Sequence, residues 1–167
     1  MEFTLRTFEK LKSLLGEFGE EIHLSKKRFK VTSLDCIDSH VPCSQGVYWI
    51  ETNMPTKTMQ DAIAQVTGKA KRVRKKAPKG SDLIEQNGTE SFVVYSGTED
   101  SLNKRLKQHL FNLGNEGTAK LGCKIDQSPF EEFEWHICFS VIESYELRYA
   151  VEAWWRLNKG WPKFCLR

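Results

Sequence analysis

Five residues of the chain have side chains that suit the hydrolysis of a phosphodiester bond. Tyr48 and Tyr95 each lie close to a glycine in a β-branched and aromatic run, and Arg105 and His109 are four positions apart. That spacing places Arg105 and His109 on one face of a helix. Glu152 follows in a later segment. The reaction needs a group that activates water, a cation that neutralises phosphate charge and a carboxylate that holds a divalent metal. Tyrosine or histidine suits the first role, Arg105 the second and a glutamate the third.

The elements that must position these residues follow from hydrophobic periodicity. β-branched and aromatic residues predict strands over residues 47–50, 92–95 and 134–142, the second of which stops at Ser96-Gly97. Leucines spaced by four, four and three predict an amphipathic helix over 102–113 that is ended by Gly114. Further helices are predicted over 4–22, 58–66 and 145–159, a short strand over 28–34, and a loop over 115–130.

This element order predicts a small α/β domain with a three-stranded, mostly antiparallel sheet flanked by helices. A chain of 167 residues suits one domain with a single core. Residues 1–45 form an N-terminal extension, and residues 46–167 form the core, with an insertion over 51–90 between its first two strands. Gly16 and Gly19 lower the helix propensity of the extension, which favours an end of its helix near them.

Positive charge is concentrated in two places, although the net charge is only +3. A chain with its basic residues gathered in this way is typical of proteins that bind a polyanion, and a solvated surface loop is the alternative. One basic cluster covers residues 26–30. The other lies inside the insertion, contains no acidic residue and consists of Lys69, Lys71, Arg72, Arg74, Lys75, Lys76 and Lys79.

Apolar stretches and cysteines restrict the environment that we expect for the chain. No apolar run approaches the roughly 20 residues of a membrane span, and the N-terminus has no basic region followed by an apolar core. Five cysteines form an odd set without a Cys-x-x-Cys pair, which favours reduced thiols over a disulfide framework or a zinc site. We therefore expect a cytoplasmic protein that does not enter a membrane.

Taken in order, these motifs resemble the GIY-YIG nuclease family. Gly46-Val47-Tyr48 comes first, Tyr95-Ser96-Gly97 second, and then the helix with Arg105 and His109. In the family, two tyrosines lie on neighbouring strands and an arginine follows on the next helix. A glutamate on a later helix precedes a Pro-x-aromatic-Asn ending. The resemblance runs from about residue 46 to residue 165, and the arginine helix is its most specific part.

The resemblance implies a role for each of the five residues. Tyr48 would be the catalytic tyrosine, acting as the general base or assisting it, and Tyr95 would be the second tyrosine of the active site. Arg105 would stabilise the scissile phosphate, and His109 would assist proton transfer. Glu152 would bind a single Mg²⁺, for which Mn²⁺ is an alternative.

Three positions bear on how well the chain matches the family pattern. Glu152 lies about three helical turns before Pro162, as the family glutamate does before its proline, whereas Glu146, the alternative, lies further away. Ser96 stands where the family has an aliphatic residue. Cys165 stands where the family has the terminal asparagine, which puts one supporting hydrogen bond in doubt.

The long basic insertion makes the chain more similar to the stand-alone type II restriction endonucleases of the family than to its repair or homing members. The resemblance thus implies a sequence-specific, Mg²⁺-dependent endonuclease for double-stranded DNA. Cutting both strands of a palindrome favours a homodimer. The N-terminal helix and residues 26–30 would then add DNA contacts or a dimer surface. A non-catalytic nucleic-acid-binding module and a structure-specific DNA or RNA nuclease are the alternatives.

Overall fold

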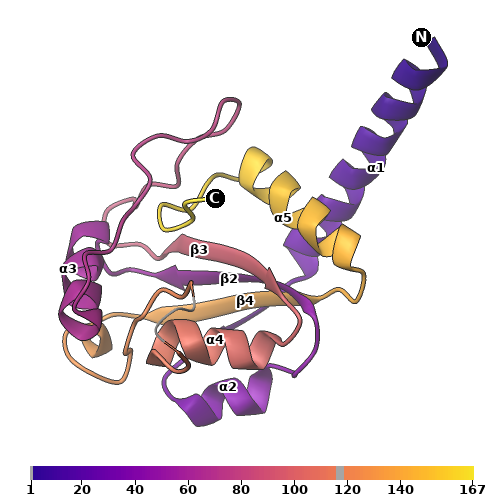
Figure 1. Ribbon diagram of the computed structural model, residues 1–167. Coiled ribbons are helices and arrows are strands. Elements are labelled where there is room, and N and C mark those ends of the chain that lie inside the picture. Colours follow the sequence, from indigo (N-terminus) through magenta and orange to yellow (C-terminus); the bar gives the residue numbers. More distant parts are fainter. Residues whose placement is uncertain (1, 116–118) are drawn as a thin grey trace.

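The sheet has four antiparallel strands in the order β1-β4-β2-β3, one strand more than the three-stranded sheet predicted from the sequence (Figure 1). The predicted α/β class is confirmed. The structure is a computed structural model that describes residues 2–115 and 119–167. In chain order the elements are α1 (Glu2–Ser25), β1 (Lys27–Lys30), α2 (Leu34–His40), β2 (Gly46–Thr52), α3 (Thr56–Thr67), β3 (Phe92–Glu99), α4 (Leu102–Phe111), the 3₁₀ helix η1 (Phe130–Glu132), β4 (Trp135–Val141) and α5 (Tyr145–Asn158).

The fourth strand comes from the N-terminal extension. β1 pairs with β4, so residues 1–45 supply an edge of the same sheet that carries the core. The strand predicted over 28–34 is shorter because Ser33 begins the helix α2, where its hydroxyl accepts a hydrogen bond from the backbone N–H of Cys36 at 3.2 Å. With only seven residues, α2 is too short to show a helical period in the sequence.

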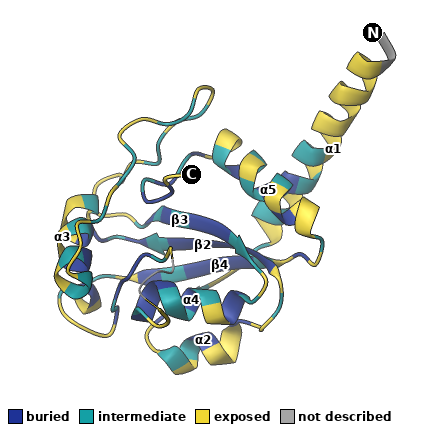
Figure 2. Ribbon diagram, in the orientation of Figure 1, coloured by how far each residue is buried: buried dark blue, intermediate teal, exposed yellow. Residues whose placement is uncertain are grey.

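Helices cover both faces of the sheet. α4, backed by α2, lies on the face that carries Tyr48, and Leu106 of α4 belongs to the same buried cluster. On the opposite face, α5 is backed by α1, and its Trp155 packs against Trp49 of β2. Figure 2 shows the strands buried between these helices. The active-site candidates therefore come from both faces of one sheet.

Two predicted element ends, those of β3 and α4, are wrong. β3 continues through Ser96 and Gly97 because both residues pair with β2, opposite Trp49 and Tyr48. A turn signal inside a strand is thus overridden by strand pairing. α4 ends at Phe111 because Asn112 adopts the left-handed conformation with φ of 52°, before Gly114 is reached.

Other predicted elements are confirmed with small shifts at their ends. α3 ends at Gly68, which has the left-handed φ of 69° that the sequence implies. β4 and α5 match the segments predicted over 134–142 and 145–159. The loop predicted over 115–130 includes residues 116–118, which lie outside the described residues, and its last residue begins η1. Nowhere in residues 2–115 and 119–167 is there a helix long and apolar enough to cross a membrane.

The N-terminal helix does not end near its glycines. α1 runs on to Ser25 because Gly16 and Gly19 give the indole ring of Trp154 room to pack on the helix. A Cβ atom on Gly19 would lie 2.3 Å from that ring, whereas a Cβ on Gly16 would meet Trp154 at an ordinary 3.8 Å. The close approach of α5 therefore requires a glycine at position 19.

We predict opposite effects for alanine at these two glycines. Gly16→Ala should raise the free energy of unfolding by up to about 1 kcal/mol, because alanine is the better helix former and finds space. Gly19→Ala should lower it by roughly 1–3 kcal/mol, because the methyl group collides with Trp154. Urea denaturation of the two variants measures both values. An equal gain in stability from both would contradict this packing of α1 on α5.

Candidate active site

A hydrogen bond buried beneath α4 joins two of the five candidate residues. The Oη atom of Tyr48 lies 2.8 Å from the Nε2 atom of His109. Tyr48 stands on β2 and His109 on the last turn of α4, and their exposed fractions are 1% and 0%. Two polar groups that are removed from water in this way need each other as partners.

The direction of this hydrogen bond follows from the second ring nitrogen of His109. The backbone N–H of Leu121 donates to Nδ1 at 2.9 Å, so Nδ1 carries a lone pair. Burial lowers the pKa of His109 well below its ordinary value, and the charges of Arg105, Lys71 and Lys120 lower it further. The ring is therefore neutral with its proton on Nε2, which donates to Tyr48. In this arrangement His109 orients Tyr48 and cannot take a proton from it.

Tyr95 completes a cluster of three rings. Pairing of Tyr48 with Gly97 places Tyr95, two residues earlier on β3, on the same face of the sheet. The ring centroids of Tyr95 and His109 are 4.5 Å apart, and those of Tyr48 and Tyr95 are 6.3 Å apart at an interplanar angle of 21°. Burial raises the pKa of Tyr48 well above its ordinary value and also raises that of Tyr95.

Gly97 provides the space in which the hydroxyl group of Tyr48 lies. A Cβ atom at this position would lie 2.5 Å from Tyr48 Oη. No side chain can be accommodated there while Tyr48 keeps its bond to His109. The glycine that follows Tyr95-Ser96 is therefore needed for the site as well as for the strand.

Arg105, on α4, lies near Tyr48 of β2. Its Nη1 donates to Oε1 of Gln108 at 2.9 Å and its Nη2 to the carbonyl of Ala119 at 2.6 Å. Nε is buried without a hydrogen-bond partner and lies 3.6 Å from Oε2 of Glu99. The positive charge of Arg105 acts against the rise in the pKa of Tyr48. A guanidinium group can bind an anionic oxygen through its N–H groups, although the Nε–H of Arg105 is buried here beside Glu99.

The two candidate glutamates have different surroundings. The side chain of Glu152 is 14% exposed, forms an ion pair with Arg156 and has a pKa raised by burial. Its charge adds to the rise in the pKa of Tyr48 and Tyr95, so it lies within electrostatic range of both. Glu146 is exposed in the first turn of α5, where it accepts a hydrogen bond from the hydroxyl of Ser144. The structure thus brings Glu152 into the site and leaves Glu146 outside it.

Ser96 and Cys165, the two departures from the family pattern, contact each other. The backbone N–H of Ser96 donates to Sγ of Cys165 at 3.3 Å, and the thiol donates back to the Ser96 carbonyl at 3.4 Å. Arg156 donates through Nε to Ser96 Oγ and through Nη2 to the Ser96 carbonyl, both at 2.9 Å. The same guanidinium also pairs with Glu152. Cys165 therefore ties the C-terminal segment to β3 and helps to hold Arg156 against Glu152.

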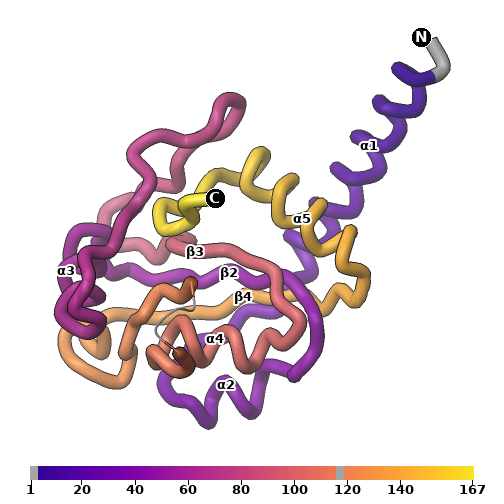
Figure 3. Tube along the Cα trace, viewed as in Figure 1, coloured from indigo at the N-terminus to yellow at the C-terminus, as the bar shows by residue number. Residues whose placement is uncertain are grey.

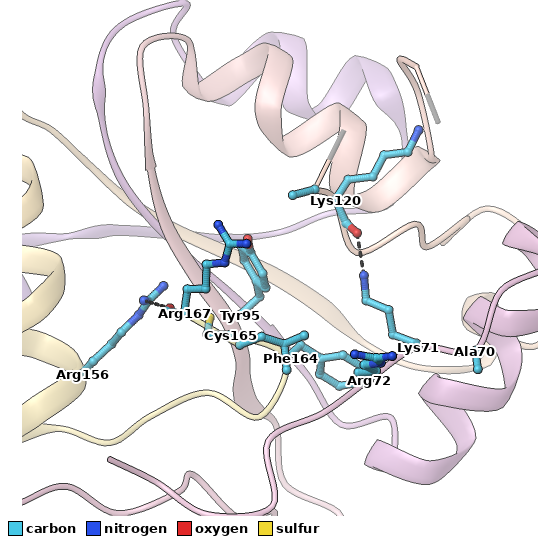
Figure 4. Close-up of a pocket in the computed structure, with 11 residues that line it drawn as sticks. Ala70, Lys71, Arg72, Tyr95, Lys120, Arg156, Phe164, Cys165 and Arg167 are labelled. Atoms are coloured by element: carbon cyan, nitrogen blue, oxygen red, sulfur yellow. Dashed lines mark hydrogen bonds between the residues drawn. The ribbon is translucent and has the colours of Figure 1, made fainter. Parts of the chain in front are cut away.

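A cationic cavity of about 480 Å³ opens beside Tyr95 (Figure 4). Within the described part of the chain, five of its lining residues are basic and none is acidic, although the Nζ atom of Lys120 is turned to the carbonyls of Asn112, Leu113 and Gly114 at the end of α4. Lys71 Nζ donates to the carbonyl of Lys120 at 2.6 Å, which links the insertion to the segment after α4. A low-dielectric hollow lined by one sign of charge concentrates ions of the opposite sign. The basic residues of the lining are Lys71, Arg72, Lys120, Arg156 and Arg167.

The basic insertion is attached to the C-terminal segment along part of its length (Figure 3). Arg74 donates to the carbonyls of Cys165 and Leu166 at 3.2 and 3.0 Å and lies over the ring of Trp161. Its charge therefore has a structural use, unlike our expectation that all seven basic residues face nucleic acid. The exposed basic residues of this segment are Lys69, Arg72, Lys75, Lys76 and Lys79.

The second basic cluster carries less free charge than its sequence suggests. Arg28 forms an ion pair with Glu51 at 2.9 Å, and Lys30 forms one with Glu134 at 3.0 Å. Both pairs lie along β1 at the edge of the sheet. This arrangement makes β1 a weaker candidate for DNA contact than the insertion.

The donor set around Glu152 fits a Mg²⁺ ion only in part. In the portions of the chain that the structure describes, no group of three or more histidine, cysteine or acidic side chains could enclose a metal. Mg²⁺ is nevertheless held in many proteins by one or two carboxylates together with water and substrate phosphates. Glu152, which pairs with Arg156 of the cavity wall, could bind Mg²⁺ in that mode, with phosphate oxygens as other ligands.

Three cavity residues were not predicted from the sequence. Arg156 lies four residues after Glu152, a spacing typical of helical ion pairs, and that signal could have identified it. Lys120 and Arg167 stand alone in loop and terminal segments. Their position depends on the tertiary fold, and no local pattern predicts it.

Comparisons with known proteins found no match: no family model, no curated protein and no solved structure is significantly similar to this chain.

We predict that His109 makes folding sensitive to mild acid. The unfolded chain takes up a proton on this ring as the pH falls below about 6.5, whereas the folded protein does not. The free energy of unfolding should therefore fall by up to about 1.4 kcal/mol per pH unit between pH 6.5 and the lowered pKa of His109. His109→Gln should remove this part of the slope in urea titrations between pH 7 and 5.

His23 and His136 serve as internal controls for this measurement. Burial lowers the pKa of both in the folded protein, so they contribute slopes of the same sign that stay in the His109→Gln variant. An identical pH dependence for wild type and His109→Gln would show that the buried ring is charged in the folded state.

Proposed function

We propose that the protein is a metal-dependent endonuclease of the GIY-YIG type that hydrolyses phosphodiester bonds in double-stranded DNA. The observation that carries this proposal is the joint position of Tyr48, His109 and Arg105 on one face of the sheet, with Glu152 within electrostatic range. In the family that the sequence resembles, the same residue types occur in the same order along the chain. The cationic cavity beside Tyr95 supports a polyanionic substrate.

The residues would have different roles in phosphodiester hydrolysis. The phosphate would enter the cavity, where Lys71 and Arg72 would attract it, and Arg105, whose Nη2 contacts Ala119 of the cavity wall, would neutralise charge that develops on its oxygens. His109 donates to the oxygen of Tyr48, and the raised pKa of Tyr48 keeps the phenol protonated, so Tyr48 would orient the attacking water by a hydrogen bond. Mg²⁺ at Glu152 would supply further charge neutralisation at the phosphate.

We propose further that cleavage is sequence-specific, as it is in restriction endonucleases. The insertion between β2 and β3 lies beside the cavity and exposes five basic residues that could contact phosphates on both sides of the cleaved bond. We place the activity in the cytoplasm, where the five free cysteines would stay reduced.

We predict that the site residues control the rate of cleavage without controlling DNA binding. Tyr48→Phe should slow cleavage of plasmid DNA in Mg²⁺ by about 10²- to 10⁴-fold, because the hydroxyl that would orient the attacking water is removed. Glu152→Gln should slow it by a similar factor, because the carboxylate for the metal is removed. Single-turnover cleavage on gels measures the rates, and gel shifts without metal measure binding.

Glu146→Gln is the matched control for this experiment. It makes the same chemical change on the same helix at an exposed position, and the cleavage rate should stay at the wild-type value. Equal rates for Glu152→Gln and wild type would remove the metal assignment. Wild-type protein that binds DNA and leaves it intact would favour a non-catalytic binding module.

We also predict that the exposed basic residues of the insertion account for the salt dependence of DNA binding. Alanine at Arg72, Lys75 and Lys76 should reduce the slope of log K against log salt by about 0.9 for each phosphate that the variant no longer neutralises. Lys57→Ala, which removes an exposed lysine from an ion pair on α3, should leave the slope unchanged. An unchanged slope in the triple variant would contradict this assignment.

Arg74→Ala should instead lower the free energy of unfolding by roughly 1–3 kcal/mol, since the hydrogen bonds of Arg74 hold the C-terminal segment. Urea denaturation measures this change.

A further inference from the structure

The first half of α1 projects from the rest of the protein (Figure 1). Every side chain from Thr4 to Leu14 is exposed, although this segment carries a row of large apolar residues. Phe8 and Leu11 are 69% and 61% exposed, and Leu5 and Leu14 are exposed to a similar degree. A helix of this length gains little stability from propensity alone, and most helices depend on packing of an apolar face. We call residues 4–14 the arm.

The apolar row of the arm continues one that is already packed. Phe8, Leu11, Leu15, Phe18 and Ile22 follow one another at alternating spacings of three and four, the pattern of a helix that packs along another helix. The last two of these side chains pack against the core beneath α5. The seam between α1 and α5 therefore extends beyond the end of α5, where no described helix of this chain covers it.

A groove lies where the arm leaves the protein. It has a volume of about 550 Å³ and runs between α1 and α5. Its apolar lining comes from Leu15, Trp154 and Leu157, and Leu157 is 45% exposed. The chain thus carries an apolar helix and an apolar groove side by side, which is the arrangement that a two-fold symmetric pair requires.

Charge along α1 favours an antiparallel partner with the same sequence. The arm carries Arg6, Lys10 and Lys12 against a single acidic residue, whereas the second half of the helix carries Glu17, Glu20 and Glu21. A second copy laid antiparallel to the first would place its basic half near Glu17 in the groove. A parallel arrangement would set like charges opposite each other.

We propose that the chain forms a homodimer in which the arm of each copy packs into the groove between α1 and α5 of the other. The exchange is reciprocal, so every contact occurs twice and the assembly closes after two copies. Phe8 and Leu11 are the apolar anchors, and Leu157 is part of the surface that receives them. This assembly goes beyond the proposed catalytic function and would hold whether or not the protein cuts DNA.

Sedimentation velocity of the full-length protein, from about 1 µM to about 100 µM, tests the proposal. The wild type should sediment with twice the chain mass of 19.3 kDa. The double variant Phe8→Glu/Leu11→Glu should sediment as a monomer, with association weakened at least about 100-fold, because two buried anchors become charged. Leu157→Glu should weaken association as well, because it changes the receiving surface on a different helix.

The matched control is Leu24→Glu, the same change at a residue of α1 that is 77% exposed and lies outside the arm. It should remain a dimer. Far-UV circular dichroism and urea midpoints near those of wild type would show that the variants are folded, as expected for substitutions at exposed positions. A wild-type monomer throughout the concentration range would overturn the proposal, including one that floats with phosphatidylcholine vesicles. A dimeric Leu157→Glu variant would overturn the groove as the receiving surface.

Discussion

The hydrogen bond between Tyr48 and His109 constrains the site more than any other contact. Both groups are buried, so each must be satisfied by the other, and His109 must also accept from the backbone of Leu121. That double requirement fixes the tautomer of the ring, the position of α4 over β2 and the course of the segment after α4. It also requires glycine at position 97, which leaves space for the hydroxyl. The neutral His109 donates to the oxygen of Tyr48 and so holds the hydroxyl group in one orientation.

A second network, on the other side of β3, meets the first at the cavity. Arg156 joins Glu152, Ser96 and the C-terminal residue Arg167, and Cys165 holds Ser96 from behind. The carboxylate proposed to bind the metal is therefore balanced by a guanidinium while phosphate and Mg²⁺ are absent. Burial raises the pKa of Glu152, and the charge of Arg156 limits that rise.

Elements that depend on one local pattern could be predicted from the sequence. The leucine spacing of α4 and the β-branched run of β2 were sufficient to place Arg105, His109 and Tyr48 on their elements. Features that depend on contacts between distant residues could not be predicted. Strand pairing carried β3 through Ser96 and Gly97, and Trp154 made a close packing position out of a glycine that would otherwise weaken α1. The cavity combines the insertion, the segment after α4, α5 and the C-terminus, and no spacing in the sequence relates such distant residues.

We propose that these two networks together hydrolyse DNA. Incubation of wild-type protein with plasmid DNA, with Mg²⁺ or with a chelator, followed by electrophoresis and end analysis of the products, tests this directly. Discrete fragments should form only with the metal, in an amount that falls as salt weakens binding. Plasmid that stays intact with Mg²⁺ and with Mn²⁺ at every salt concentration would contradict it.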